Sequence, residues 1–214
     1  MVEQLRVARP GNLLLGVLLL LAVVTHLGRG LDAAALLYVL AGLCFLWFRD
    51  PERHVPSAPL GVVSPVDGRV ESIESAHDPF LNREALCLRL KVRLLGAYSL
   101  RAPIEGRIVE LHGLPPDAGA GYALHLKTDE GNELELVMTA RRLRRRGPVI
   151  MIGRRLGQGQ HWGSARPLRR VSLLLEPSVR LKVEPGDRVT AGSDVLALLS
   201  APPNGRSGGE REAE

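Results

Sequence analysis

The chain of 214 residues has room for one domain and an appendage. Its 28 basic residues outnumber its 23 acidic residues, and a net charge of +5 favours an anionic partner such as a membrane surface. The two cysteines, Cys44 and Cys87, lie in different segments and form neither a disulfide framework nor a metal-ligand spacing. We therefore predict no metal site and expect both cysteines to be small buried residues.

Two apolar runs near the N-terminus predict a helical membrane hairpin. They cover residues 13–27 and 31–48, with a Gly28-Arg29-Gly30 turn between them. Each run approaches the roughly 20 residues that a helix needs to cross a bilayer, and neither has the polar face of a surface helix. A signal peptide would explain only the first run, and two buried core helices are the weaker alternative.

The charges around these runs predict their orientation. Arg6 and Arg9 precede the first run, and Arg49 follows the second. The short segment between the runs carries only Arg29 and Asp32. By the positive-inside rule, both ends of the hairpin face the cytoplasm. We therefore predict a membrane protein with its β domain on the cytoplasmic side.

The remaining chain divides by composition. Residues 49–60 are rich in proline and charge and read as an extended connector. Residues 61–200 have strand-like patterns, and residues 201–214 have the composition of a disordered tail. With residues 1–12 as an N-terminal cytoplasmic tail and residues 13–48 as the hairpin, this division covers the whole chain.

Apolar alternation predicts a mainly β domain. In residues 87–94 the side chains of Leu88, Leu90, Val92 and Leu94 fall on one face of a strand. Residues 124–138 predict a β-hairpin around a turn at Asp129-Glu130-Gly131-Asn132. Further short strands follow at a spacing of roughly 8–12 residues. Only residues 140–156 offer a helical alternative.

Four stretches carry a resemblance to a known family. They are FRDPER at 48–53, SPVDGRV at 64–70, LRAPIEGRIVE at 100–110 and VEPGDRVTAG at 183–192. In this order, behind a hydrophobic hairpin, they resemble the short, single-domain, membrane-anchored phosphatidylserine decarboxylases over residues 48–197. The last stretch alone also occurs in biotinyl and lipoyl carrier domains, so the order of the four carries the resemblance. It implies a β domain of the barrel-sandwich kind.

The resemblance also implies a particular chemistry. In that family a serine of a Gly-Ser pair attacks the preceding carbonyl, the chain splits, and the serine becomes an N-terminal pyruvoyl group. This group acts as an electron sink when phosphatidylserine loses CO2 to give phosphatidylethanolamine. An aspartate and a histidine assist the serine during self-cleavage. Three positions of this chain therefore decide its activity.

Two of the three positions are degenerate in a gapless alignment. Asp67 matches the aspartate, although an Asp-Gly turn is its ordinary structural role. Tyr98 stands where the histidine is expected, three residues before Arg101, and a phenol with a pKa of about 10 is a poor base at pH 7. Arg169 stands at the serine position, and an arginine cannot become a pyruvoyl group. The leading hypothesis is a member without a cofactor, which binds lipid or regulates another lipid enzyme.

A second alignment keeps the activity open. Trp162-Gly163-Ser164 resembles the family's aromatic-Gly-Ser, with residues 165–169 as an insertion. Ser164 would then supply the pyruvoyl group of an active decarboxylase, with cleavage between Gly163 and Ser164. His161 could replace the missing histidine, although a lone histidine next to a tryptophan is more often an ordinary surface or interface residue.

An arginine-rich stretch predicts contact with anionic phospholipid. Residues 141–170 contain ten arginines and no Asp or Glu. Near an anionic membrane surface each is worth on the order of 1 kcal/mol, whereas a solvated basic face is the alternative. No aromatic interleaving or binding motif supports nucleic acid. A role as a biotinyl or lipoyl carrier would need a lysine at the tip of a hairpin, and this sequence does not place one there. The predicted headgroup contacts are Arg141, Arg142, Arg144, Arg145, Arg146, Arg154 and Arg155.

Overall fold

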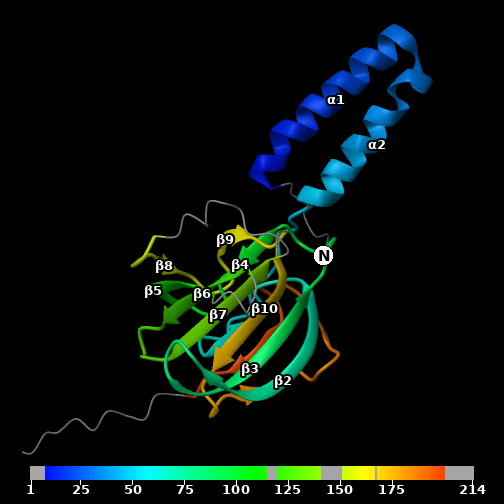
Figure 1. Cartoon of the computed structure of the whole chain (residues 1–214). Helices are drawn as coiled ribbons and strands as arrows, with labels where there is room; N and C mark the ends of the chain where they lie inside the picture. Colours follow the sequence, from blue (N-terminus) through cyan, green and yellow to red (C-terminus); the bar gives the residue numbers. More distant parts are fainter. Residues whose placement is uncertain (1–7, 115–119, 141–150, 167, 201–214) are drawn as a thin grey trace, which may run out of the picture.

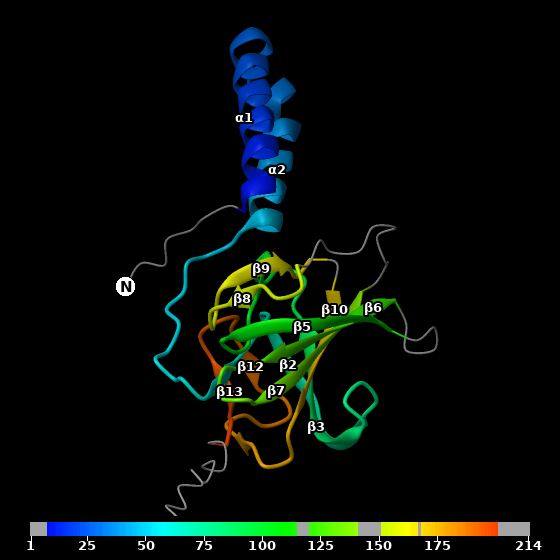
Figure 2. The ribbon, with the colours of Figure 1, turned by 90° about the vertical axis from the view of Figure 1, so that its left-hand side faces the viewer.

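The computed structural model describes residues 8–114, 120–140, 151–166 and 168–200. A pair of antiparallel helices stands on one end of a β domain (Figure 1). The connector after the second helix runs down one side of this domain before the first strand (Figure 2). The N-terminal residues 1–7 and the predicted tail at 201–214 lie outside the described residues.

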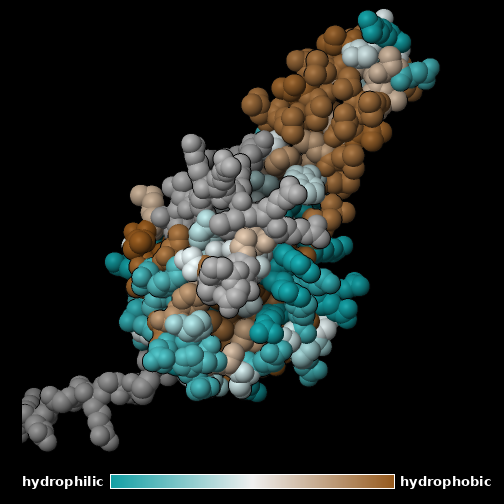
Figure 3. Space-filling view, in the orientation of Figure 1, coloured by the Kyte–Doolittle hydropathy of each residue, from teal (hydrophilic) through white to brown (hydrophobic). Residues whose placement is uncertain are grey.

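The two helices form the predicted hairpin. They are α1 (Arg9–Arg29) and α2 (Leu31–Phe48), joined at Gly30, which has a φ of 87° that glycine adopts without steric cost. Both are long and apolar enough to cross a membrane, with a mean hydropathy of 2.0. Hydrophobic side chains cover most of the visible surface of both, and hydrophilic residues gather at the end away from the β domain (Figure 3). The buried Ala22, Ala34 and Ala41 let the two backbones pack closely.

An eight-stranded antiparallel sheet forms most of the β domain and curls into a half-barrel (Figures 1 and 2). Its strand order is β12-β2-β3-β10-β7-β6-β5-β8. The strands are β2 (Gly68–Asp78), β3 (Arg83–Val92), β5 (Gly106–Gly113), β6 (Gly121–Lys127), β7 (Glu133–Ala140), β8 (Arg155–Leu156), β10 (Leu168–Leu175) and β12 (Arg188–Val189). The prediction of a mainly β domain behind a helical hairpin is therefore confirmed.

Two smaller sheets complete the domain. One has the order β1-β13-β11, and the other pairs β4 with β9. Their strands are β1 (Gly61–Val63), β13 (Val195–Leu198), β11 (Arg180–Leu181), β4 (Ser99–Arg101) and β9 (His161–Ser164). Val62 of β1 and Leu196 of β13 are fully buried in the same hydrophobic core as the main sheet.

The inner face of the main sheet follows the predicted alternation. Leu88 and Leu90 of β3 are fully buried and lie opposite Leu173 and Val171 of β10. The prediction fails for Leu94, because β3 ends at Val92 and Leu94 lies beyond it with 56% of its surface exposed. The chain turns away from the sheet at Arg93, whose amide donates to the carbonyl of Asp67 at 2.8 Å.

The predicted β6–β7 hairpin is confirmed. Leu124 lies opposite Leu136, and both are fully buried. The amide of Asn132 donates to the hydroxyl of Thr128 at 3.1 Å, and Gly131 has a φ of 93°. Of the residues with a helical alternative, 141–150 lie outside the described residues, and 151–156 form a turn and β8.

Candidate functional site

The connector after α2 lies directly against strand β4. The amide of Tyr98 donates to the carbonyl of Arg49 at 2.9 Å, and both the amide and the hydroxyl of Ser99 donate to the Asp50 carboxylate. A guanidinium N–H of Arg101 donates to the carbonyl of Pro51 at 3.3 Å. The stretch between helix and sheet is therefore bonded to the domain from its first residue.

Asp67 lies at the meeting point of the sequence motifs. Its carboxylate accepts two hydrogen bonds from Arg53, at 2.5 and 3.0 Å, and one each from the amides of Ala97 and Ala191 at 2.8 Å. Arg53 belongs to FRDPER, Asp67 to SPVDGRV and Ala191 to VEPGDRVTAG, while Ala97 lies just before LRAPIEGRIVE. The Asp67 carboxylate thus holds stretches together that are far apart in the chain.

The electrostatics of Asp67 follow from these partners. Burial would raise the pKa of its carboxyl group, but the hydrogen bonds and charge of Arg53 and the amides of Ala191 and Ala97 outweigh burial. The pKa of Asp67 therefore lies below its ordinary value. The ion pair is nearly closed to solvent, since the side chains of Arg53 and Asp67 are only 8% and 11% exposed.

Tyr98 contacts the foot of the membrane hairpin. Its ring packs against Phe48, the last residue of α2, with 5.3 Å between the ring centroids. Its carbonyl accepts from the amide of Ala165 at 2.8 Å. Among the described residues, the Tyr98 hydroxyl has no hydrogen bond to Asp67 or to Ser164. The side chain at the expected histidine position therefore serves as a packing contact.

Ser164 lies across from the segment that carries Tyr98. In the β4–β9 pair, Ser164 is in register with Ser99, and Gly163 with Leu100. The hydroxyl of Ser164 accepts from the amide of Arg166 at 3.4 Å, and no other partner is seen within the described ranges. The ring nitrogen Nε2 of His161 lies 2.8 Å from the Gly163 carbonyl oxygen, the atom that a Ser164 attack would charge. Asp67, which accepts from the Ala97 amide, and Ser164, which pairs with Ser99, thus both contact the segment 97–99.

Arg169 lies elsewhere, at the start of β10. The register of β10 against β7 shifts between Leu168 and Arg170, and Arg169 is the exposed residue at this bulge. It lines a pocket of about 220 Å³ together with Arg93, Ala165 and other residues. The fold therefore places Ser164, and not Arg169, opposite β4.

Most of the predicted headgroup contacts fall outside the described residues, namely Arg141, Arg142, Arg144, Arg145 and Arg146. Of the other two, Arg154 is exposed. Arg155 lies 2.9 Å from the Glu105 carboxylate and 2.6 Å from that of Asp129. The lipid-binding role of this stretch stays a prediction.

Arg166 joins the hairpin to the β domain. Its guanidinium donates to the carbonyls of Leu46 and Trp47 at the end of α2, at 3.3 and 2.7 Å, and lies over the Trp47 ring. It also donates to the carbonyls of Leu94 and Gly96 in the β3–β4 loop. Arginine side chains stabilise the last carbonyls of a helix in this way. In the sequence, Arg166 is one of the ten arginines of residues 141–170, and no local pattern distinguishes it from the others.

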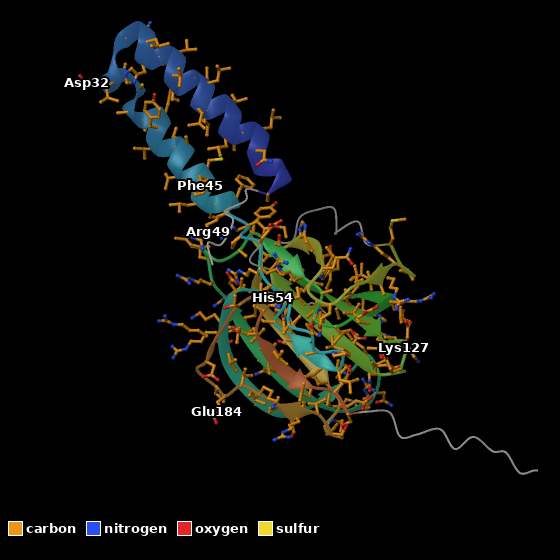
Figure 4. All side chains as sticks on the ribbon, turned by 180° about the vertical axis from the view of Figure 1, so that it is seen from behind. Asp32, Phe45, Arg49, His54, Lys127 and Glu184 are labelled. Carbon is orange, nitrogen blue, oxygen red and sulfur yellow. The ribbon has the colours of Figure 1, made fainter. Side chains whose placement is uncertain are left out.

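A basic pocket of about 570 Å³ opens beside Asp67. Figure 4 shows nitrogen-tipped side chains gathered on this side of the domain, just below Arg49. In the part of the chain that the structure describes, Lys91, Arg93 and Arg188 have no carboxylate within salt-bridge distance. Such a pocket attracts anions. Its basic lining residues are Arg49, Arg53, Arg69, Lys91, Arg93 and Arg188.

These features define a membrane-associated β protein with a cationic pocket at the foot of its hairpin. The chain is 30% identical over 205 residues to the phosphatidylserine decarboxylase proenzymes of Burkholderia multivorans and Burkholderia vietnamiensis, covering 90% of this chain and 96% of each relative. The proenzyme of Paraburkholderia phymatum is 29% identical over the same length. No family model and no solved structure matches. The chain belongs to the phosphatidylserine decarboxylase family of phospholipid metabolism.

Proposed function

We propose that this chain is a family member that does not cleave itself, forms no pyruvoyl group and acts by binding anionic phospholipid. The observation that carries the proposal is the environment of Ser164. Its hydroxyl contacts only the amide of Arg166 among the described residues, and the expected base position holds Tyr98, which packs on Phe48. A serine needs an adjacent base to become a nucleophile. These contacts support the proposal that the pyruvoyl group, on which the family depends, does not form in this chain.

The basic pocket supports the lipid-binding half of the proposal. Lys91, Arg93 and Arg188 bring positive charge to a site that borders Arg49, the residue that follows α2. Phosphate and carboxylate groups of lipids would therefore meet cations at the level where the hairpin leaves the bilayer. A lipid-bound protein of this kind could also regulate another lipid enzyme.

The cytoplasmic location of the β domain belongs to the same proposal. The described start of α1 and the end of α2 lie on the side of the hairpin that faces the β domain (Figure 1), where Arg49 and Arg53 follow the second helix. The opposite end carries only Arg29 and Asp32. Protease treatment of inside-out vesicles should digest the β domain, and protection of the domain there would contradict this orientation.

Intact mass under denaturing conditions tests the absence of self-cleavage. We expect one uncleaved species near 23.2 kDa, and likewise one uncleaved species for the Ser164→Ala variant. Two fragments that divide between Gly163 and Ser164, and that disappear in Ser164→Ala, would overturn the proposal. Reaction of the smaller fragment with a carbonyl reagent would then identify a pyruvoyl group.

Titration with soluble short-chain lipids tests the binding site. The full chain in a neutral detergent should bind short-chain phosphatidylserine and phosphatidylglycerol, and phosphatidylcholine much less. Combined Arg93→Glu and Arg188→Glu substitutions should weaken lipid binding at least tenfold. They should also reduce the salt dependence of binding, because dissolved salt screens the attraction between exposed cations and anionic lipid, and the variant has fewer such cations. Combined Arg107→Glu and Arg180→Glu substitutions, at exposed arginines of β5 and β11, are the matched control with the same change in net charge. Equal weakening in both variants would argue against the pocket.

One observation favours a second function, an active decarboxylase with its cofactor formed from Ser164. His161 lies 2.8 Å from the Gly163 carbonyl oxygen, and a proton donated there would stabilise the negative charge that attack places on this oxygen. In this case fragments should form, and both His161→Ala and Ser164→Ala should remove them. Fragments that persist in His161→Ala would exclude His161 from the process.

A further inference from the structure

Residues 93–96, in the loop between β3 and β4, present an apolar tip that the fold does not bury. Leu94 and Leu95 are 56% and 54% exposed, although the alternation of β3 would have placed Leu94 in the core. Arg93 and Lys91, next to them in the chain, are also exposed. Two adjacent exposed leucines beside cations form an amphipathic patch of the kind that occurs at membrane contacts.

The loop is held at the foot of the hairpin. One guanidinium, that of Arg166, donates to the carbonyls of Leu94 and Gly96 and also to those of Leu46 and Trp47. The loop backbone and the last turn of α2 are therefore within reach of one side chain. Trp47 is itself 42% exposed, and a tryptophan at the end of an apolar helix is typical of the membrane–water interface.

Basic pockets flank the loop on both sides. Leu95 borders the pocket of about 570 Å³, and Leu94 borders the pocket of about 220 Å³. Lys91 and Arg93 line both pockets. An apolar tip between cationic hollows combines the two forces that bind proteins to anionic bilayers, namely burial of apolar side chains and attraction to headgroups.

We propose that the 93–96 loop is a second membrane contact, in which Leu94 and Leu95 insert into the bilayer interface and Lys91 and Arg93 meet anionic headgroups. The bilayer is the occupant that the structure favours, because Arg166 joins the loop to the end of a helix that is apolar enough to cross it. The inference depends on membrane insertion of the hairpin. It goes beyond the proposed function and is independent of whether Ser164 is cleaved.

Fluorescence quenching on the full chain tests this contact. Cys44 and Cys87 are replaced by alanine, and an environment-sensitive dye is attached to Leu95→Cys. The protein is reconstituted into vesicles of equal parts phosphatidylcholine and phosphatidylglycerol, with a trace of lipid that carries a nitroxide near the headgroup end of its chain. We expect blue-shifted emission and quenching several-fold stronger than for a dye at Glu184→Cys, which lies at the end of the domain away from the hairpin (Figure 4).

Each other outcome overturns the proposal. Emission as in water, without quenching, at Leu95→Cys would mean that the loop stays in solvent. Blue-shifted emission that the nitroxide lipid does not quench would mean that protein, either a second copy or a partner, covers the loop. A labelled Leu94→Cys variant repeats the measurement one residue away, and a circular dichroism spectrum like that of the unlabelled chain verifies that each variant is folded. Binding of soluble short-chain lipid in the pocket has no bearing on this result, so the two proposals fail separately.

Discussion

Two buried carboxylates in the same β domain, Asp67 and Glu135, have opposite surroundings. Asp67 receives four hydrogen bonds, two of them from the cation Arg53, and its pKa lies below the ordinary value. Glu135 of β7 is fully buried, and neither of its oxygens has a hydrogen-bond partner in the described ranges. Burial, helped by the charge of Asp78, raises the pKa of Glu135 to about 8.

The difference shows that partners, more than burial, decide the charge of an acid inside this domain. Glu135 sits in register between His125 of β6 and Leu174 of β10, and His125 Nδ1 is 3.9 Å from its nearer oxygen. Burial also lowers the pKa of His125, so the imidazole supplies no strong positive charge. A carboxyl group without donors is cheaper to bury in its neutral form, and Glu135 is mostly protonated at pH 7.

The largest effect is expected for Asp67→Asn, which removes the charge from the ionised member of the two carboxylates compared above. Asp67→Asn removes the negative charge that faces Arg53 inside a buried ion pair and should lower the free energy of unfolding by about 3–5 kcal/mol. Chemical denaturation of the full chain in detergent measures this. Asp129→Asn, which removes a partner of Arg155 from an exposed pair, is the control and should cost less than about 1 kcal/mol. Equal losses of unfolding free energy in Asp67→Asn and Asp129→Asn would mean that the buried ion pair of Asp67 stabilises the fold no more than an exposed one.

The pH dependence of the same pair has a definite sign. The folded pKa of Asp67 is lowered, so its stabilisation is complete above the unfolded value of about 3.9 and is lost as the pH falls through the folded pKa. In Asp67→Asn this part of the acid destabilisation should be absent. If the free energy of unfolding falls at low pH as steeply in the variant as in the wild type, other carboxylates control unfolding in acid.

A smaller effect of opposite sign is expected for Glu135→Gln. The folded pKa of about 8 exceeds the unfolded value of about 4.3, so the free energy of unfolding should fall as the pH rises from one value to the other. The variant cannot ionise, and its stability should decline less over this range. Thermal unfolding at a series of pH values measures the slope, with the exposed Glu184→Gln as control. A variant with the wild-type slope would refute a neutral Glu135.

The smallest effect is expected two residues away, at Glu133. Its carboxylate lies 2.9 Å from Lys127 Nζ, and the two side chains are 24% and 50% exposed. Solvent screens such a pair, so Glu133→Gln should change the free energy of unfolding by less than about 1 kcal/mol. A loss as large as that of Asp67→Asn would show that exposure is a poor guide to the value of ion pairs in this domain.

Local patterns were sufficient to predict much of the fold. The uninterrupted apolar runs predicted both helices, and alternation predicted the buried Leu88 and Leu90 of β3. Alternation failed at Leu94, because the end of a strand depends on a tertiary bond, here from the Arg93 amide to the Asp67 carbonyl. The bend of the sheet and the order of its strands depend on contacts between distant residues, which no local period encodes.

The candidate site was predicted less completely. The motifs identified Asp67, but no spacing indicates that Arg53, Ala97 and Ala191 converge on its carboxylate. The alignment left Arg169 and Ser164 as competing positions, and only strand pairing places Ser164 opposite β4. The role of Arg166 was invisible, since an arginine that binds carbonyls of two remote segments has the same local surroundings in sequence as its exposed neighbours.

The bond between Tyr98 and Arg49 has a mechanical consequence. The carbonyl of Arg49, the first residue after α2, accepts a hydrogen bond from the amide of Tyr98, the residue before β4. No flexible linker therefore lies between the end of the helix and the β domain. The hairpin and the β domain should then change orientation together, as one rigid unit. A hydrophobic helix tilts when the bilayer around it is thinner than its apolar length. Bilayer thickness would thereby set the angle at which the domain faces the lipid surface.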